Sequence, residues 1–169
     1  HRLGIASHVF VDTFAHQGFI GQRTALNRAS KIKEASQRAL SGKKAPKVGH
    51  ALVDTYPDRP YLRWQYTNAD GEVVNRNNPE DFTQAADELC EHYQRYLIGD
   101  PQAKVNGLGE YKDLLYKIFC EIKEPDGDKR LETWIDLIRG NQFCFGSEKL
   151  SYIAEALEYF SNAVVFPPS

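Results

Sequence analysis

The sequence contains no methionine, no Cys-x-x-Cys spacing and no apolar run long enough to cross a bilayer. It has three cysteines, at positions 90, 120 and 144. Because their number is odd and their spacing irregular, we do not expect a disulfide framework. The simplest interpretation is that Cys90, Cys120 and Cys144 are small buried apolar residues.

A capping residue is also missing at the start, where His1 leads directly into a helical pattern. Together with the absence of methionine, this predicts that the chain is the C-terminal fragment of a longer protein, cut inside or just before a helix. The partner implied by this interpretation is the missing N-terminal half of the same protein. A targeting signal would lie in that half, so the sequence leaves both a cytoplasmic and a secreted location open.

The charge is nearly balanced, with a formal net charge of −2, but it is unevenly distributed. Residues 21–49 carry eight basic side chains and one acidic side chain, Glu34. We interpret this stretch as a solvated face or a mobile loop. The alternative is a surface that attracts a phosphate-rich substrate or an anionic surface. Nucleic acid is not indicated, because no aromatic residues are interleaved for base stacking.

Apolar periodicity predicts an all-α fold, a multi-helix bundle, with one small β-hairpin near residues 61–75. Residues 2–17 are apolar around the whole circumference, which predicts a buried helix. Residues 23–41 are interpreted as an exposed helix or a mobile loop. The other expected helices cover residues 46–56, 79–98, 108–123, 128–139 and 147–161. Residues 1–169 are expected to form a single helical domain.

Three side chains that can bind metal recur at four-residue spacing in the first helix: His8, Asp12 and His16. Four residues advance an α-helix by roughly 400°, so the three stay within about 80° of one another. Two imidazoles and a carboxylate are a common zinc ligand set. The row therefore predicts a metal site. The alternative is a hydrogen-bonded pair in which Asp12 holds one of the histidines.

A second segment repeats this spacing, with His50 and Asp54 on a predicted short helix. Alone it is a weak signal, because an exposed His and Asp on a short helix are ordinary. His92 is interpreted as a surface residue. Asp58 is interpreted as a turn residue, with a supporting role beside the site as the alternative.

These residues resemble the zinc-dependent phospholipase C superfamily, which includes related single-strand nucleases. The string His8-x-x-x-Asp12-Thr-Phe-Ala-His16-Gln-Gly18-Phe19, with Gly49-His50 and Pro57-Asp58 downstream, is more similar still to an uncharacterised bacterial family of unknown function. The strong match covers about residues 3–20 and 48–60. The later helices match in type alone.

The resemblance implies a phosphate-ester hydrolase with one to three zinc ions in the full-length protein. His8 would bind one zinc, and Asp12 would bridge it to a second. A third zinc would be held by His16, His50 and Asp54. Asp12 and Asp54 are the residues expected to matter most for catalysis. Asp54 stands where the superfamily usually has Glu, and the remaining ligands would come from the missing N-terminal half.

Three functions from different classes compete. The first is a zinc-dependent phosphoesterase-like hydrolase, which we expect to be inactive as a fragment. The alternative is a helical partner-binding domain with a structural or vestigial metal site. It is motivated by the missing half and by the aromatic residues Tyr61, Trp64 and Tyr66, which are expected to be exposed beside a turn. The third is a nucleotide metallohydrolase of the histidine-aspartate type, which needs an adjacent His-Asp pair that the sequence lacks.

Overall fold

The computed structural model describes residues 2–34 and 47–140. The chain divides into a larger compact unit that ends at Lys123 and a smaller one that begins at Glu124. The expected single helical domain over residues 1–169 stays a prediction, and the helix expected at 147–161 lies outside the described residues.

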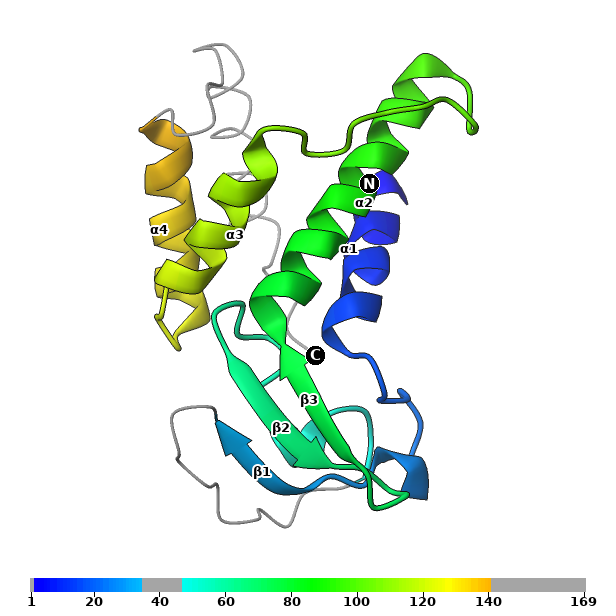
Figure 1. Cartoon of the computed structure of the whole chain (residues 1–169), viewed down its shortest axis with the longest axis vertical. Coiled ribbons are helices and arrows are strands. Elements are labelled where there is room, and N and C mark those ends of the chain that lie inside the picture. Colours follow the sequence, from blue (N-terminus) through cyan, green and yellow to red (C-terminus); the bar gives the residue numbers. More distant parts are fainter. Residues whose placement is uncertain (1, 35–46, 141–169) are drawn as a thin grey trace, which may run out of the picture. The chain divides into compact units, whose positions relative to one another are not determined.

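A three-stranded antiparallel sheet lies at one end of the larger unit (Figure 1). Its strands are β1 (Ser30–Glu34), β2 (Arg63–Thr67) and β3 (Val73–Asn77), in the order β1-β2-β3. The turn between β2 and β3 is closed by Asn68, whose side-chain oxygen accepts hydrogen bonds from the amides of Asp70 and Glu72. This confirms the predicted hairpin.

The predicted all-α class is wrong, because the described residues combine this sheet with four α-helices in a mixed α/β fold. The error lies in the stretch 23–41, which was expected to be an exposed helix or mobile loop. Its residues 30–34 form β1 and pair with β2, and its residues 35–41 lie outside the described part of the chain. Only Ile32 of β1 is buried, so the strand has almost no alternating pattern. An irregular register between Ser30 and Lys33, with Lys31 at a φ of 51°, weakens the pattern further. Pairing with β2 outweighs the local spacing.

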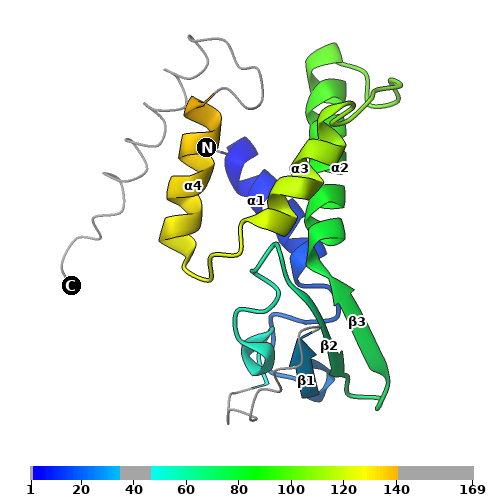
Figure 2. The ribbon, with the colours of Figure 1, turned by 60° about the vertical axis from the view of Figure 1, so that its left-hand side comes forward.

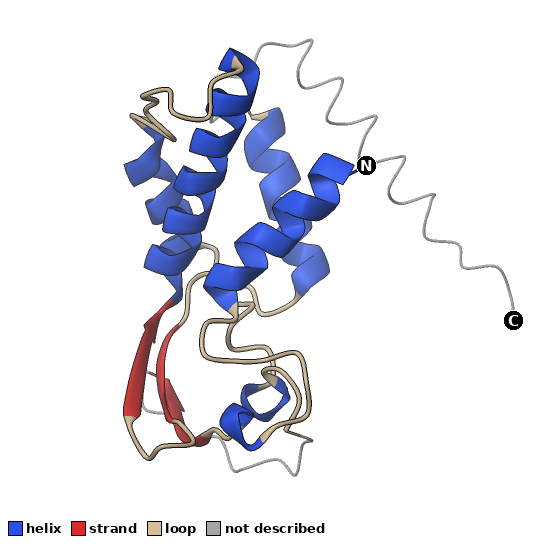
Figure 3. Cartoon of the chain, turned by 90° about the vertical axis from the view of Figure 1, so that its right-hand side faces the viewer, coloured by secondary structure: helices blue, strands red, loops and turns tan. Residues whose placement is uncertain are grey.

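The core is formed by residues of β1, of β2 and of the segment between them. Figure 3 shows the loops before β2 along one face of the sheet. The buried members of the core are Ile32, Val53, Tyr56, Leu62, Trp64 and Tyr66. Each large side chain contributes roughly 1.5–3 kcal/mol by leaving water. Trp64 and Tyr66 are only 3% and 4% exposed, so they are core residues and not the exposed aromatic residues that the sequence suggested.

Buried Asn78 connects this core to the loop that follows η2 (Ala51–Val53). Its side-chain oxygen accepts a hydrogen bond from Trp64 Nε1 at 3.0 Å. Its amide nitrogen donates to the carbonyls of Tyr56 and Arg59 at 2.7 and 2.8 Å. Hydrogen bonds are directional, and those of the buried Asn78 amide therefore hold the loop at residues 56–59 in one position.

Two long helices pack side by side, α1 (Arg2–Ala15) and α2 (Asn78–Ile98), as Figures 1 and 2 show. Phe10 of α1 packs edge-on against His92 of α2, and Ser7 hydrogen-bonds to Tyr93. Helix α2 has Pro79 in its first turn and ends before Gly99, which has a left-handed backbone conformation. These ends agree with the predicted range 79–98.

The prediction that the first helix is buried is wrong. Leu3, Ile5 and Val9 of α1 keep 54%, 66% and 58% of their surface exposed, and Ala15 alone in the helix is buried. Apolar residues are distributed around the helix, as the sequence predicted. Among the described residues, however, α2 covers one side of α1 and leaves the opposite side uncovered.

Helix α3 (Tyr111–Glu121) packs on α2 and completes the larger unit. Helix α4 (Gly127–Arg139) belongs to the smaller unit and is capped by Asp126, whose side chain accepts hydrogen bonds from the amides of Asp128 and Lys129. Both helices confirm the ranges predicted from periodicity. In residues 2–34 and 47–140, no helix has the length and apolar composition to cross a membrane.

The contact between α2 and α3 yields a pH-dependent prediction. Burial of Asp87 opposes ionisation, but hydrogen bonds from Lys112 Nζ and the Leu108 amide outweigh it and lower the pKa of the Asp87 carboxyl. A lowered folded-state pKa stabilises the fold above the unfolded value of 3.8. That stability is lost as the pH falls through the folded pKa.

We expect Asp87→Asn to lower the free energy of unfolding by about 1 kcal/mol at pH 7, measured in urea. The difference from wild type shrinks below pH 4, because the wild-type carboxyl then becomes neutral too. Glu121→Gln is the control, since Glu121 and Lys117 form an exposed pair at 3.9 Å. An Asp87→Asn difference that stays constant down to pH 2 would contradict the assignment.

Candidate functional site

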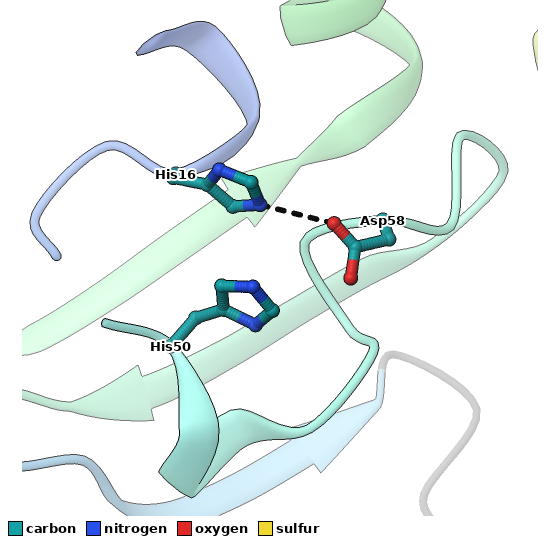
Figure 4. Close-up of side chains that lie close together, drawn as sticks. All are labelled: His16, His50 and Asp58. Atoms are coloured by element: carbon teal, nitrogen blue, oxygen red, sulfur yellow. Dashed lines mark hydrogen bonds and ion pairs between the residues drawn. The ribbon is translucent and has the colours of Figure 1, made fainter. Parts of the chain in front are cut away.

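His16, His50 and Asp58 come together where three separate segments of the larger unit meet (Figure 4). His16 follows the end of α1, His50 precedes η2, and Asp58 lies in the loop between η2 and β2. One ligand atom from each lies within 4.8 Å of the other two. All three side chains are partly buried, so an ion could reach them from solvent.

The position of His16 depends on Arg76, a buried residue of β3 that is 7% exposed. Its guanidinium donates hydrogen bonds of 2.9 to 3.1 Å to three carbonyls around the end of α1, those of Phe14, Ala15 and Gln17. A helix end leaves such carbonyls without intrahelical partners and favours a cation there. Asp81 of α2 neutralises the guanidinium at 2.8 Å. The chain therefore leaves α1 in a fixed direction at His16.

His50 is oriented by a backbone carbonyl. Its Nδ1 lies 2.7 Å from the carbonyl oxygen of Asp54, and since a carbonyl only accepts, Nδ1 carries the proton. Nε2 is then the nitrogen with a lone pair for a metal, the outer-shell arrangement common for metal-binding histidines. Asp54 reaches this position with φ 55° and ψ −133°, a strained conformation for a residue with a Cβ.

Asp58 is fixed by the loop that Asn78 anchors. Its amide donates to the Thr55 carbonyl at 3.1 Å, and prolines 57 and 60 restrict the backbone on either side. The carboxylate Oδ1 lies 3.0 Å from His16 Nε2. Figure 4 shows the carboxylate facing the edge of both imidazoles.

The two imidazoles are stacked, with ring centres 4.4 Å apart and planes 5° from parallel. Zinc holds His nitrogen and Asp oxygen at about 2.0–2.2 Å, so two ligand atoms on a tetrahedral ion lie about 3.4 Å apart. The separation of His16 Nε2 and Asp58 Oδ1, 3.0 Å, lies just below that value, and the other separations are at most 4.8 Å. The donor types suit one ion, but lone pairs in parallel ring planes do not meet at one point, so one imidazole must turn out of the stack to bind it.

The structure brings together two of the five predicted ligands, His16 and His50, and adds Asp58. His8 and Asp12 form a pair of their own at 3.4 Å, in which their side chains are 76% and 42% exposed. Asp54 contributes its carbonyl to His50. In the described part of the chain, no other group of three His, Cys, Asp or Glu residues meets the 4.8 Å spacing. The metal-binding and catalytic roles of His8, Asp12 and Asp54 stay predictions.

The sequence predicted Asp58 as a turn residue, with a supporting role beside the site as the alternative. In the sequence, Asp58 follows His50 and Asp54 at the same four-residue spacing as in the row His8, Asp12 and His16. That spacing does not describe the structure, because a 3-10 turn and a loop join His50 to Asp58. A second signal was the pair of prolines around Asp58-Arg59, which predicts a rigid loop that can present a side chain.

The role of Arg76 leads to a stability prediction. We expect Arg76→Ala to lower the free energy of unfolding by roughly 3–5 kcal/mol, because it leaves the Asp81 carboxylate and the helix-end carbonyls without their donor. Arg95→Ala is the matched control, since Arg95 pairs with Glu91 near the surface of α2. Equal losses for the two variants in urea unfolding would contradict the role of Arg76.

The strained backbone at Asp54 leads to a second prediction. Asp54→Gly and Asp54→Ala both remove the carboxylate and keep the carbonyl, but only glycine adopts this φ and ψ without strain. We expect the glycine variant to be more stable than the alanine variant by about 1 kcal/mol or more. Thermal unfolding of the pair measures the difference. An alanine variant as stable as the glycine variant would show that the backbone there is relaxed.

Comparison with known proteins gives one match. No curated protein and no solved structure matches the chain significantly. The sequence profile of a family of unknown function, DUF6765, matches residues 1–166, nearly the whole chain. The chain therefore belongs to this family of unknown function, DUF6765.

Proposed function

We propose that this protein binds a divalent transition metal ion, with zinc as the first candidate, at His16, His50 and Asp58, and that it hydrolyses phosphate esters there. The observation that carries the proposal is the convergence of three ligand atoms within 4.8 Å from three independently anchored segments.

The donor set favours zinc. Two imidazoles and one carboxylate with a fourth position left for water or substrate are the ligands of many catalytic zinc sites. Structural zinc sites, in contrast, are closed by four protein ligands. A bound zinc ion would supply Lewis acidity and lower the pKa of a bound water to about 7.

The chain's own residues would hold and orient this ion. The proton of His50 Nδ1 is engaged by the Asp54 carbonyl, which keeps Nε2 available. Asp58 brings a negative charge that offsets the charge of the ion, and the 3.0 Å contact with His16 would give way to shared coordination. The described residues provide such a group for one ion, within the one to three zinc ions expected for the full-length protein.

The phosphate-ester class rests on the resemblance to the zinc-dependent phospholipase C superfamily. It is supported by Arg59, which follows Asp58 directly in the chain. Its guanidinium lies over the Tyr56 ring at 5.5 Å, and its Nε donates to the Thr55 hydroxyl at 3.1 Å. A cation fixed next to a metal ligand favours an anionic substrate.

The test is metal binding, which does not depend on catalytic activity. We expect metal-free protein to bind one zinc ion by calorimetry and to gain thermal stability with zinc. His50→Ala and Asp58→Asn should weaken zinc binding by at least about 100-fold, more than a change outside the first shell produces. Cobalt in place of zinc reports the ligand geometry through its visible absorption.

His8→Ala is the matched control, because His8 lies outside the group and its side chain is 76% exposed. We expect its zinc affinity to equal that of wild type. Circular dichroism verifies that each variant is folded. Zinc affinity that His50→Ala and Asp58→Asn leave unchanged would refute the site, and zinc binding without phosphodiester hydrolysis by the full-length protein would refute the activity.

Partner binding is the second candidate function, and the exposure of the apolar side chains of α1 favours it. Ile5 and Val9 lie on the side of the helix that carries Asp12 and that leads to His16, so the uncovered surface is continuous with the metal-ligand group. The occupant we propose is the N-terminal half of the same protein. A melting temperature unchanged by chelation, with a stable complex in pull-down, would favour this function over hydrolysis.

A further inference from the structure

Tyr66 of β2 has a hydroxyl group that the fold does not use. The residue is 4% exposed, and its ring is stacked between Trp64 and Phe19 with centre distances of 5.2 and 5.4 Å. Among residues 2–34 and 47–140, nothing forms a hydrogen bond with this hydroxyl. The oxygen is not among the side-chain atoms that are fully shielded from solvent, so the hydroxyl is open to water or to a ligand while its ring is buried.

The hydroxyl lies at a pocket of about 570 Å³ that Tyr66 lines. The pocket is formed by the segment after α1 and by the turn between β2 and β3. Its apolar wall consists of Phe19, Ile20, Leu26 and Val74. The rest of the lining is mostly polar and includes Gln17, Asn68, Asp70, Asn75, Arg76 and Asp81. The volume is in the range of small-molecule sites.

Gly18 keeps the space beside the hydroxyl open. A Cβ at this position would lie 2.9 Å from the Tyr66 oxygen and would meet no other atom within 4 Å. The backbone of Gly18 has a φ of +83°, which favours glycine as well. Because Gly18 has no side chain, it does not block a ligand from reaching the Tyr66 hydroxyl.

The charges at the pocket favour an uncharged ligand. Arg76 is committed to Asp81 and to the carbonyls at the end of α1. Asp70 adds a further negative charge to the lining. Burial raises the pKa of Tyr66 despite the opposing charge of Arg76, so its hydroxyl is protonated at neutral pH and can donate.

We propose that this pocket binds an uncharged small molecule with an apolar body and a carbonyl oxygen, and that the oxygen accepts a hydrogen bond from the Tyr66 hydroxyl. The site is separate from the His16, His50 and Asp58 group, none of which lines the pocket. The proposal does not depend on metal binding.

Benzamide and benzoate are suitable probes, because they share a ring and differ in charge. In amide NMR titrations we expect benzamide to shift the signals of Gly18, Ile20 and Val74 saturably, in the millimolar range of a fragment this small. Benzoate should bind more weakly. Tyr66→Phe should weaken benzamide binding about five-fold, the value of one neutral hydrogen bond.

Tyr61→Phe is the matched control, since Tyr61 packs against the same core but does not line the pocket. We expect it to bind benzamide like wild type. Tyr66→Phe should also unfold at the wild-type temperature or above, because it removes a hydroxyl without a partner. Benzamide binding equal to wild type in Tyr66→Phe, the absence of shifts at Gly18 and Ile20, or a clearly lowered melting temperature of Tyr66→Phe would each overturn the proposal.

Discussion

The arrangement of the larger unit depends on the ion pair and hydrogen bonds that the Arg76 guanidinium makes. A buried cation is costly unless it is paired and hydrogen-bonded, and Arg76 meets both conditions with one carboxylate and three helix-end carbonyls. These partners belong to α1, the segment after it, and α2, while Arg76 itself lies in β3. One side chain thus fixes the end of the helix pair against the sheet. His16 is the first residue beyond α1, so its direction is a consequence of this contact.

The other two members of the metal-ligand group are held by unrelated means. His50 depends on a strained backbone at Asp54, and Asp58 depends on a loop that Asn78 ties to the core. None of these three anchors requires a metal ion. Segments that are already anchored lose little backbone entropy on binding, so the main adjustment left is the turn of one stacked imidazole. The strain at Asp54 is the kind of local cost that functional sites often carry.

The sequence was sufficient where structure is local. Helices α2, α3 and α4 and the hairpin follow from long periodicity and from turn residues such as Asn68 and Gly99. The sequence was insufficient where contacts with a segment distant in the chain determine the structure. A single buried residue, Ile32, marks β1, and only β2 makes that segment a strand. The apolar composition of α1 predicted burial, but composition does not say what covers a helix. His50 and Asp54 were expected on a helix, whereas a 3-10 turn and a positive φ aim the Asp54 carbonyl at the ring.

Residues 16–19 border both sites, since His16 belongs to the metal-ligand group and the next three residues line the pocket at Tyr66. A ligand in the pocket changes metal affinity only if it binds two states of this segment with different strength. Arg76 opposes such a second state, because it holds the Gln17 carbonyl and itself lines the pocket. Moving His16 would mean breaking hydrogen bonds to a buried charge, which costs far more than a weak pocket ligand contributes. The two sites should therefore bind their ligands independently.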